Sequence, residues 1–281
     1  MTDRQISTFD TLSKAEISAL LPEPLRKQVG IVLFDTIDST NNAAKDPVLA
    51  NRLRTPEHPV LPDELLFLAE EQTAGRGRLG RSFYSPRGSG IYMTYSFRPC
   101  FPLAEVTQVT PIAAVAAHRV LSRYSAGPLR IKWVNDLYRG DRKITGILVE
   151  GIGSTSSGNF ERIIIGIGIN CTPAAVPEEL RGIAGSLTDD PHPDFTRNQL
   201  IAAITAELHN ELTRTSLSDP ERLAYYRANC YLTGKDVTVH PAGAPSYRAK
   251  ALGISDTYAM VVQVGDKIVE LTSGEVSVRT D

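Results

Sequence analysis

The spacing of hydrophobic positions divides the chain into a part with both helices and strands and a final part with strands alone. Helical spacing is clearest from Pro111, where Ile112, Val115 and Val120 share one face behind Thr110 as N-cap. This helix is expected to end at Gly127-Pro128. Further helices are predicted over 13–21, ended by Pro22 and Pro24, over DSTNNAAK from 38, after Thr196, and from Asp219-Pro220 to near Cys230.

Five segments carry apolar or β-branched runs of strand length. They are IVLFDTID at 31–38, LLFLAEEQ at 65–72, LRIKWVNDLY at 129–138, KITGILVEGI at 143–152 and RIIIGIGIN at 162–170, with a proline-rich loop at 54–63. Short turns join the last three, which favours adjacent and mostly antiparallel strands. Because helices and strands interleave irregularly, we expect an α+β fold in which helices flank a mixed or antiparallel sheet.

After Leu232 the helical period disappears. The segments KDVTVHP, YRAKALGISD, YAMVVQVGDKIVEL and EVSVRT are short alternating strands separated by Gly and Asp turns. About fifty residues of this kind predict a small β-barrel. We therefore predict a catalytic domain over 1–231, in which 1–29 is an N-terminal extension, and a barrel domain over 232–281.

Composition narrows the class of protein. The 281 residues include 30 Lys+Arg and 32 Asp+Glu, a net charge of −2, which argues against binding nucleic acid or membrane by bulk charge. Cys100, Cys171 and Cys230 form no CxxC motif, so free thiols in a reducing compartment are expected. No signal-peptide segment and no apolar run of the ~18 residues that span a bilayer is visible. We expect a cytoplasmic protein without a membrane partner.

Charge is distributed unevenly, however. The window 72–104 contains no acidic residue but holds Arg76, Arg78, Arg81, Arg87 and Arg98, and it begins with QTAGRGRLGRSFYSPRGSG. Its glycines allow the backbone to approach a ligand, and guanidinium groups can fork onto carboxylate or phosphate oxygens. A solvated basic loop is the alternative, but the aromatic residues Phe83, Tyr84, Tyr92 and Tyr95 that follow favour anchoring in the fold.

Two glycine patterns resemble nucleotide motifs and fail on context. Residues 75–82 nearly match a phosphate-binding loop, but Pro86, Gly88 and Gly90 prevent the helix that must follow it. GIG at 166–168 starts like a dinucleotide fingerprint and lacks the third glycine and the helix. What remains is a strand whose glycines expose backbone to a flat ligand.

The segment RIKWVNDLYRGDRK places several polar groups close together. On one continuous strand, Lys132, Val134 and Asp136 would share a face. They could form only a surface ion pair, or they could be a phosphate-binding lysine with an Asn135–Asp136 pair able to hold magnesium. Lys143 follows a tight turn and is, by itself, an ordinary turn lysine.

These segments together resemble the biotin protein ligases. The pattern consists of DSTN at 38–41, QxxGRGRxGR at 72–81, KWxNDLY at 132–138, KxxGILVE at 143–150 and GIGIN at 166–170. The resemblance runs from about residue 30 to the end and implies a class II aminoacyl-tRNA synthetase-like catalytic domain followed by an SH3-like barrel. Val134 departs from the family, which commonly has proline there; this changes local stiffness and leaves the chemistry untouched.

The resemblance implies a two-step reaction. The family joins the carboxylate of biotin to the α-phosphate of ATP, giving biotinyl-5′-AMP and pyrophosphate, with Mg²⁺ as cofactor. A lysine of a biotin carboxyl carrier domain, typically of acetyl-CoA carboxylase, then takes the biotinyl group. Clustered guanidinium groups and magnesium suit phosphoryl chemistry, which depends on positioning and charge neutralisation.

Site residues follow from the same resemblance. Biotin binding is assigned to Ser39, Thr40, Asn41, Gln72, Gly75, Arg76, Gly77, Arg78, Lys143 and Gly146. Binding of ATP and the adenylate is assigned to Arg78, Arg81, Lys132, Trp133, Asn135, Gly168 and Asn170. The catalytic residues are Lys143, Arg78 and Asp136; Asp136 is also the candidate magnesium ligand and the candidate base for the acceptor lysine.

Further expectations concern the loop and the alternatives. The glycine- and arginine-rich segment that begins at Gln72 is called the arginine loop below. With five uncompensated positive charges, it is expected to become ordered only when biotinyl-AMP is bound. The alternatives are a lipoate–protein ligase of the related fold, a biotin-responsive DNA-binding repressor and a non-catalytic biotin-binding protein. The roughly thirty residues before the core are too few for a winged helix, so no nucleic-acid partner is expected. The expected oligomeric state is monomer or weak homodimer.

Overall fold

The structure is a computed structural model that describes residues 10–54, 60–153, 158–173, 180, 182–190, 193–241, 243–272 and 276–280. Part of the predicted 54–63 loop lies outside the described residues. In chain order the elements are α1 (Lys14–Leu20), α2 (Glu23–Gln28), β1 (Val29–Ile37), α3 (Thr40–Lys45), α4 (Pro47–Arg52), β2 (Glu64–Gln72), η1 (Arg78–Gly80), β3 (Gly90–Phe97), η2 (Leu103–Gln108), α5 (Val109–Leu121), β4 (Leu129–Lys132), β5 (Asp136–Arg139), β6 (Arg142–Ile152), β7 (Arg162–Asn170), α6 (Arg197–Leu212), α7 (Pro220–Ala228), β8 (Asp236–Pro241), β9 (Tyr247–Ile254), β10 (Met260–Val264), β11 (Lys267–Leu271) and β12 (Val276–Thr280).

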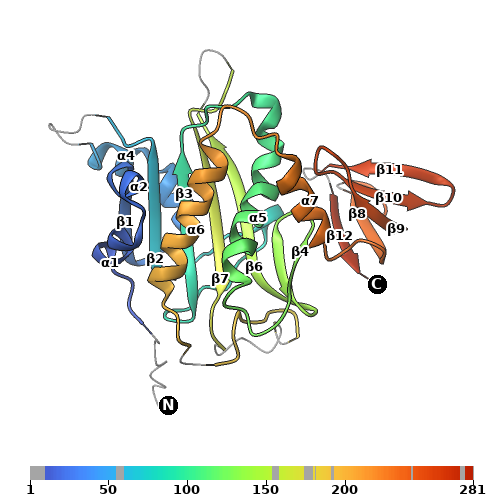
Figure 1. Ribbon diagram of the computed structural model, residues 1–281, viewed down its shortest axis with the longest axis horizontal. Coiled ribbons are helices and arrows are strands. Elements are labelled where there is room, and N and C mark those ends of the chain that lie inside the picture. Colours follow the sequence, from blue (N-terminus) through green and yellow to red (C-terminus); the bar gives the residue numbers. More distant parts are fainter. Residues whose placement is uncertain are drawn as a thin grey trace.

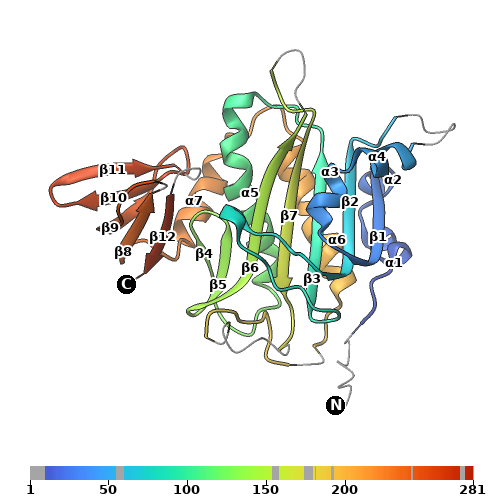
Figure 2. The same cartoon turned by 180° about the vertical axis from the view of Figure 1, so that it is seen from behind.

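The first sheet has seven strands in the order β1-β2-β3-β7-β6-β5-β4. Strands β1 and β2 are parallel, because α3 and α4 lie between them in the chain, and every other neighbouring pair is antiparallel. Helices α5 and α6 cover one face (Figure 1), whereas α3 and the segment between β2 and β3 cross the other (Figure 2). The mixed, helix-flanked sheet of the predicted α+β class is confirmed.

Helix starts follow local capping chemistry. Ser13 accepts a hydrogen bond from the N–H of Glu16 at the start of α1, and Thr196 forms a capping box with Gln199 at the start of α6. The first predicted helix is confirmed, since α1 ends at Leu20, before Pro22 and Pro24. The helix α2, which has Pro22 as its N-cap, was not predicted. A proline in the first turn loses no intrahelical hydrogen bond.

Helix α5 begins two residues before the predicted start. Its N-cap is Gln108, whereas Thr110 was predicted, and the helix ends at Leu121, before Gly127. The helix is buried almost all round, between the sheet and α6. The sequence predicted one apolar face for this helix, whereas residues on nearly all of its faces are buried.

Two strands differ from prediction. β3, which lies next to the central strand β7, was missed, although the apolar residues at 91, 93, 95 and 97 alternate with Tyr92, Thr94 and Ser96. The single strand predicted over 129–138 was also wrong: it is a hairpin of β4 and β5, in which Lys132 lies opposite Asp136. Lys132 and Asp136 therefore meet across two strands.

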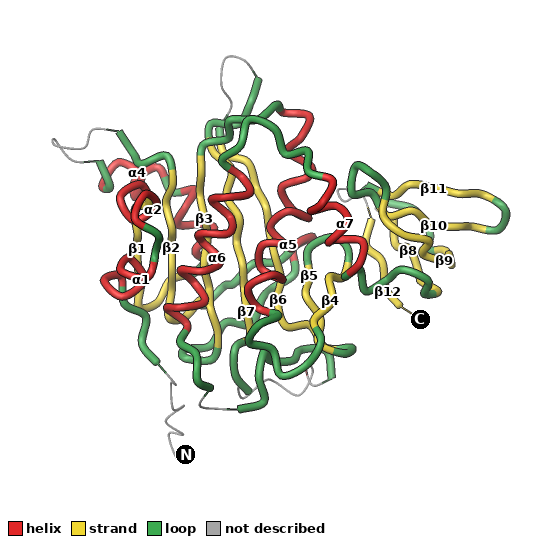
Figure 3. Tube along the Cα trace, in the orientation of Figure 1, coloured by secondary structure: helices red, strands yellow, loops and turns green. Residues whose placement is uncertain are grey.

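The C-terminal part is a five-stranded antiparallel sheet in the order β11-β10-β9-β8-β12. Figure 3 shows it as a small module of strands beside α7, at one end of the first sheet. The expected SH3-like module is confirmed, and its start at Asp236 falls where the sequence pattern changes. The hydrophobic core continues across the junction, since Tyr226 of α7 packs edge-on against Tyr258 of the module. The division into domains at 231/232 stays a prediction.

Among the helices that the structure describes, none is long and apolar enough to cross a membrane.

Candidate active site

A pocket of about 460 Å³ lies between the first sheet, α3 and the β2–β3 segment. Strands β6 and β7 form its floor, and the β4–β5 hairpin closes one side. The predicted site residues that line it are Ser39, Thr40, Asn41, Gln72, Arg76, Gly77, Arg78, Arg81, Lys132, Trp133, Asn135, Asp136, Lys143, Gly146 and Gly168. The fold therefore brings the five motifs into one cavity.

One wall of the pocket consists of neutral side chains that hydrogen-bond to one another. Thr40 donates its backbone N–H and its hydroxyl to Oε1 of Gln72, at 2.9 and 3.1 Å. Thr94 of β3 lies 2.6 Å from Oδ1 of Asn41 and 2.8 Å from the hydroxyl of Thr40. Three consecutive residues at the start of α3 are buried in this wall: Ser39, Thr40 and Asn41. Such a wall suits a neutral ring that carries both donors and acceptors.

The segment 73–89 folds over the pocket as a narrow loop. Inside it, the N–H of Gly77 donates to the carbonyl of Arg81 at 2.7 Å. Phe83 anchors the loop, because its ring lies so close to Gly168 that a Cβ there would be 2.6–2.8 Å from three ring carbons. The expected aromatic anchor is thus present. That the loop orders only over a ligand stays a prediction.

The other end of the pocket is cationic. The charged lining residues are Arg76, Arg78, Arg81, Lys132 and Lys143, against the single carboxylate of Asp136. Nζ of Lys143 lies 2.7 Å from Oδ1 of Asp136, and Nη1 of Arg78 donates to Oδ1 of Asn135 at 3.2 Å. Burial lowers the pKa of Arg78, the charge of Asp136 opposes this, and Arg81 adds to it. A guanidinium remains charged even so, and this end can bind carboxylate and phosphate oxygens.

The expectation of five uncompensated arginines was wrong. Arg87 forms a two-pronged pair with Asp35 of β1, with both distances 2.6 Å, and Arg98 pairs with Asp63 at 3.1 Å. Arg76 lies 3.5 Å from Glu150 of β6. Asp35 and Glu150 belong to β1 and β6, and Asp63 directly precedes β2, so all three acids lie outside the acid-free window. Arg78 and Arg81 both line the pocket, where Arg78 donates to Asn135.

The hairpin of β4 and β5 shows which groups the polar residues at 132–136 contact. Asp136 forms its ion pair with Lys143, and the ammonium of Lys132 lies 4.7 Å from the ring centre of Tyr138. Asp136 is thus engaged by Lys143, whereas Lys132 contacts the ring of Tyr138. Trp133, whose peptide bond to Val134 is cis, is buried and donates Nε1–H to the carbonyl of Tyr258 in the C-terminal module at 2.9 Å.

Two predicted residues do not line the pocket. A Cβ at Gly75 would collide with the carbonyl of Phe83, so Gly75 allows the loop to close on itself. Asn170 donates Nδ2–H to the carbonyl of Gly185 at 3.0 Å and supports the 183–185 segment. The lining residues that sequence reasoning missed are Leu79, Ser82, Phe83, Met93, Tyr138, Ile147, Leu148, Gly166, Ile167 and Ile183. Alternation along β6 and β7 could have indicated Leu148 and Gly166; nothing in the sequence indicates Ile183.

The lining fits a magnesium ion only in company with a nucleotide. In the described part of the chain, no group of three or more His, Cys, Asp or Glu side chains could hold a metal. Asp136 is a single carboxylate, and Mg²⁺ typically takes one or two carboxylates together with phosphate oxygens. Asp136 would hold such an ion beside the phosphates. The arrangement as a whole is typical of an enzyme that joins a small carboxylate to a nucleotide.

Comparison with known proteins agrees with this class. Residues 33–170 match the biotin/lipoate A/B protein ligase family. The chain is 30% identical over 277 residues to the bifunctional ligase/repressor BirA of Bacillus subtilis (strain 168), covering 97% of this chain and 81% of that protein. It is 27% identical over 218 residues to the biotin–[acetyl-CoA-carboxylase] ligase of Mycobacterium tuberculosis, covering 76% and 79%. This chain belongs to the biotin/lipoate A/B protein ligase family.

A solved structure shows the same fold. The biotin protein ligase from Aquifex aeolicus, in complex with biotin and ATP, superposes with a TM-score of 0.70 at 23% identity, over 90% of this chain and 99% of that one.

Proposed function

We propose that the protein is a biotin protein ligase. It activates biotin with ATP to biotinyl-5′-AMP and transfers biotin to a lysine of a biotin carboxyl carrier domain, of acetyl-CoA carboxylase or a similar carboxylase. The observation that carries this proposal is one pocket with two chemically different ends: a neutral hydrogen-bonding wall at Thr40, Asn41 and Gln72, and a cationic end around Lys143 and Arg78. The names of the Mycobacterium tuberculosis and Aquifex aeolicus proteins support it.

In the first step, Lys143 binds the reacting carboxylate of biotin. Asp136 holds the ammonium of Lys143 at the pocket before substrate arrives. One biotin carboxylate oxygen attacks the α-phosphorus, the bond to the β-phosphate oxygen breaks, and pyrophosphate leaves. Arg78 and Arg81 neutralise the charge on the phosphate oxygens, and Asn135 orients Arg78 through its hydrogen bond.

In the second step, the amine of the acceptor lysine attacks the acyl carbon, the bond to the phosphate oxygen breaks, and AMP leaves. The amine must first lose a proton, because a lysine with its ordinary pKa of about 10.4 is charged at neutral pH. Asp136, the carboxylate lining the cationic end, accepts it. Lys143 remains on the departing phosphate.

Magnesium would be held by Asp136 and would neutralise part of the triphosphate charge. The 73–89 loop, closed by Phe83, excludes water from the acyl phosphate. The protein acts where ATP and its carboxylase occur, in the cytoplasm, as a monomer or weak homodimer.

The test is incubation with biotin, Mg-ATP and a purified carrier domain. We expect pyrophosphate release and a biotinylated carrier, both lost on Lys143→Ala, and no transfer when lipoate replaces biotin. Transfer of lipoate at an equal rate would favour the lipoate ligase, and biotin binding without pyrophosphate release would favour a non-catalytic binding protein.

DNA binding is a separate question, because the Bacillus subtilis relative is named as a ligase and a repressor. We expect none, since α1 and α2 are packed on the core through Ile17 and Leu25, both buried. A salt-dependent gel shift with operator-like DNA in the presence of biotin and ATP would contradict this.

A further inference from the structure

Glu150 is a charged residue of β6 that the mechanism above does not use. It lies on the same face of the strand as Gly146 and Leu148, which line the pocket, but does not line it itself. Its side chain is 24% exposed and its Oε2 accepts a hydrogen bond from Nδ2 of Asn41 at 2.9 Å. The carboxylate of Glu150, which lies just outside the pocket, thus binds the side-chain amide of Asn41 in the pocket wall.

The contact with Asn41 is the end of a longer chain of hydrogen bonds. Oδ1 of Asn41 accepts from the hydroxyl of Thr94, which also contacts the hydroxyl of Thr40. The backbone N–H of Thr40 donates to Oε1 of Gln72 at 2.9 Å, and Nε2 of Gln72 donates to Ser85 at 3.0 Å. The chain runs along the whole neutral wall of the pocket, from Glu150 on the sheet to Ser85 in the arginine loop.

An ionised carboxylate can only accept hydrogen bonds, so it fixes the direction of this chain. With Nδ2 of Asn41 facing Glu150, Oδ1 must face Thr94, and the amide cannot turn over without setting an oxygen against the carboxylate. Burial raises the pKa of Glu150, but hydrogen bonds from Lys45 and Asn41 outweigh it, and the pKa lies below its ordinary value. Glu150 is therefore an acceptor at neutral pH.

Glu150 also connects two parts of the pocket. Its Oε1 lies 2.9 Å from Nζ of Lys45 at the end of α3 and 3.5 Å from Nη1 of Arg76 in the loop. Gly166 leaves the space that this arrangement needs, because a Cβ there would collide with Oδ1 of Asn41.

We propose that Glu150 is a positioning residue for recognition of the biotin ring: it orients the amide of Asn41 and thereby sets which groups of the pocket wall donate and which accept hydrogen bonds. This rests on the proposed function. Lys45 shares the carboxylate but has no place in the chain from Asn41 to Ser85, so it provides a matched control.

The variants are Glu150→Gln, which can accept or donate, and Lys45→Gln. Biotin affinity is measured from the fluorescence of Trp133, the single tryptophan, which lines the pocket; ATP dependence is measured from pyrophosphate release. We expect Glu150→Gln to raise the Kd for biotin about tenfold, the effect of one hydrogen bond to a charged group. The KM for ATP and the kcat at saturating biotin should stay within about twofold, and Lys45→Gln should match the wild type in all three.

A double-mutant cycle separates positioning from a structural role. In an Asn41→Ala background, Glu150→Gln should lose most of its effect on biotin affinity, because that effect passes mainly through Asn41; what remains measures the contact with Arg76. Unchanged biotin Kd in Glu150→Gln, additive losses in the cycle, or equal changes in the biotin and ATP constants would each overturn the proposal. A wild-type protein that forms no biotinyl-AMP would overturn the proposed function instead, which the pyrophosphate assay detects directly.

Discussion

At position 168 the site depends on the absence of a side chain. Gly168 and its cross-strand partner Gly146 form a bare patch on the floor of the pocket, on which the ring of Phe83 lies. We predict that Gly168→Ala displaces Phe83 and with it the loop, lowering kcat/KM for pyrophosphate release about tenfold with little change in the melting temperature. Gly127→Ala is the control, because its nearest atoms are 3.8 Å away. Equal activity of the two variants would contradict the role of Phe83.

A second prediction concerns the geometry of Arg78. Its guanidinium is bound by Asn135 and can still present further N–H groups to phosphate, which an ammonium on a shorter stem cannot do. Arg78→Lys should raise the KM for ATP by about tenfold. Arg98→Lys, in the same acid-free window but paired with Asp63, should behave as wild type. Pyrophosphate release over a range of ATP concentrations gives the KM for ATP of both variants. An equal rise of this KM in both would contradict a specific role for the position of Arg78.

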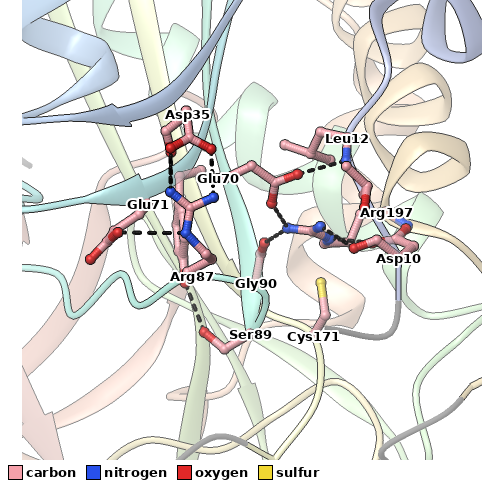
Figure 4. A network of polar contacts seen from close by, with 12 residues as sticks. Asp10, Leu12, Asp35, Glu70, Glu71, Arg87, Ser89, Gly90, Cys171 and Arg197 are labelled. Carbon is pink, nitrogen blue, oxygen red and sulfur yellow. Dashed lines mark hydrogen bonds and ion pairs between the residues drawn. The ribbon is translucent and has the colours of Figure 1, made fainter. Parts of the chain in front are cut away.

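At the scale of elements, buried arginines join segments distant in the chain. Figure 4 shows Arg197 of α6, fully buried, contacting Asp10 before α1, Glu70 of β2 and the carbonyl of Gly90. Because removal of one partner leaves charges buried without compensation, we predict that Arg197→Met lowers the free energy of unfolding by about 3–5 kcal/mol. Arg87→Met, which breaks the exposed pair in the same figure, should leave the urea midpoint nearly unchanged. Similar midpoints for both would refute this.

Packing of α5 against β4 predicts a dependence of stability on pH. His118 is buried between Tyr225 and the carbonyl of Leu129, and burial lowers its pKa. In the unfolded chain the imidazole takes up a proton as pH falls below about 6.5, whereas in the folded protein it resists. Stability should therefore fall from about pH 6.5 downward until the lowered pKa is reached. Urea midpoints at pH 7.5 and 5.5 should differ less in His118→Gln; an equal difference would assign the effect to other groups.

Elements with a periodic or capped sequence could be predicted, and those defined by distant partners could not. The signal for α6 is local, because Thr196 and Gln199 cap it within one turn. The break of 129–138 into a hairpin depends on pairing with β6 and has no local signal. β3 was missed although residues 93–97, MTYSF, alternate as a strand does. The motifs indicated most of the residues that line the pocket, whereas the pairing of Arg87 with Asp35 and Glu71 depends on how β1 and β2 pack beside the loop.

At the scale of the whole molecule, the C-terminal module is tied to the active site. Its Tyr258 accepts the indole N–H of Trp133, a pocket residue, and packs against Tyr226, while Arg227 donates to the carbonyl of Ile254 at 2.8 Å. The hydrophobic core is continuous over this junction and includes Val237. A junction with a shared core and direct hydrogen bonds resists separation of its parts more than a flexible linker does.

We therefore predict one cooperative unfolding transition for the chain. Fluorescence of Trp133 reports the junction and the pocket, while far-UV circular dichroism reports both sheets, so the two urea curves should coincide. Biotin with Mg-ATP binds the folded state alone and should raise both midpoints equally. An earlier transition in the dichroism signal, unaffected by ligand, would show that the strand module unfolds independently. Coincident curves would show that the strand module and the first sheet unfold as one unit, as their shared core predicts.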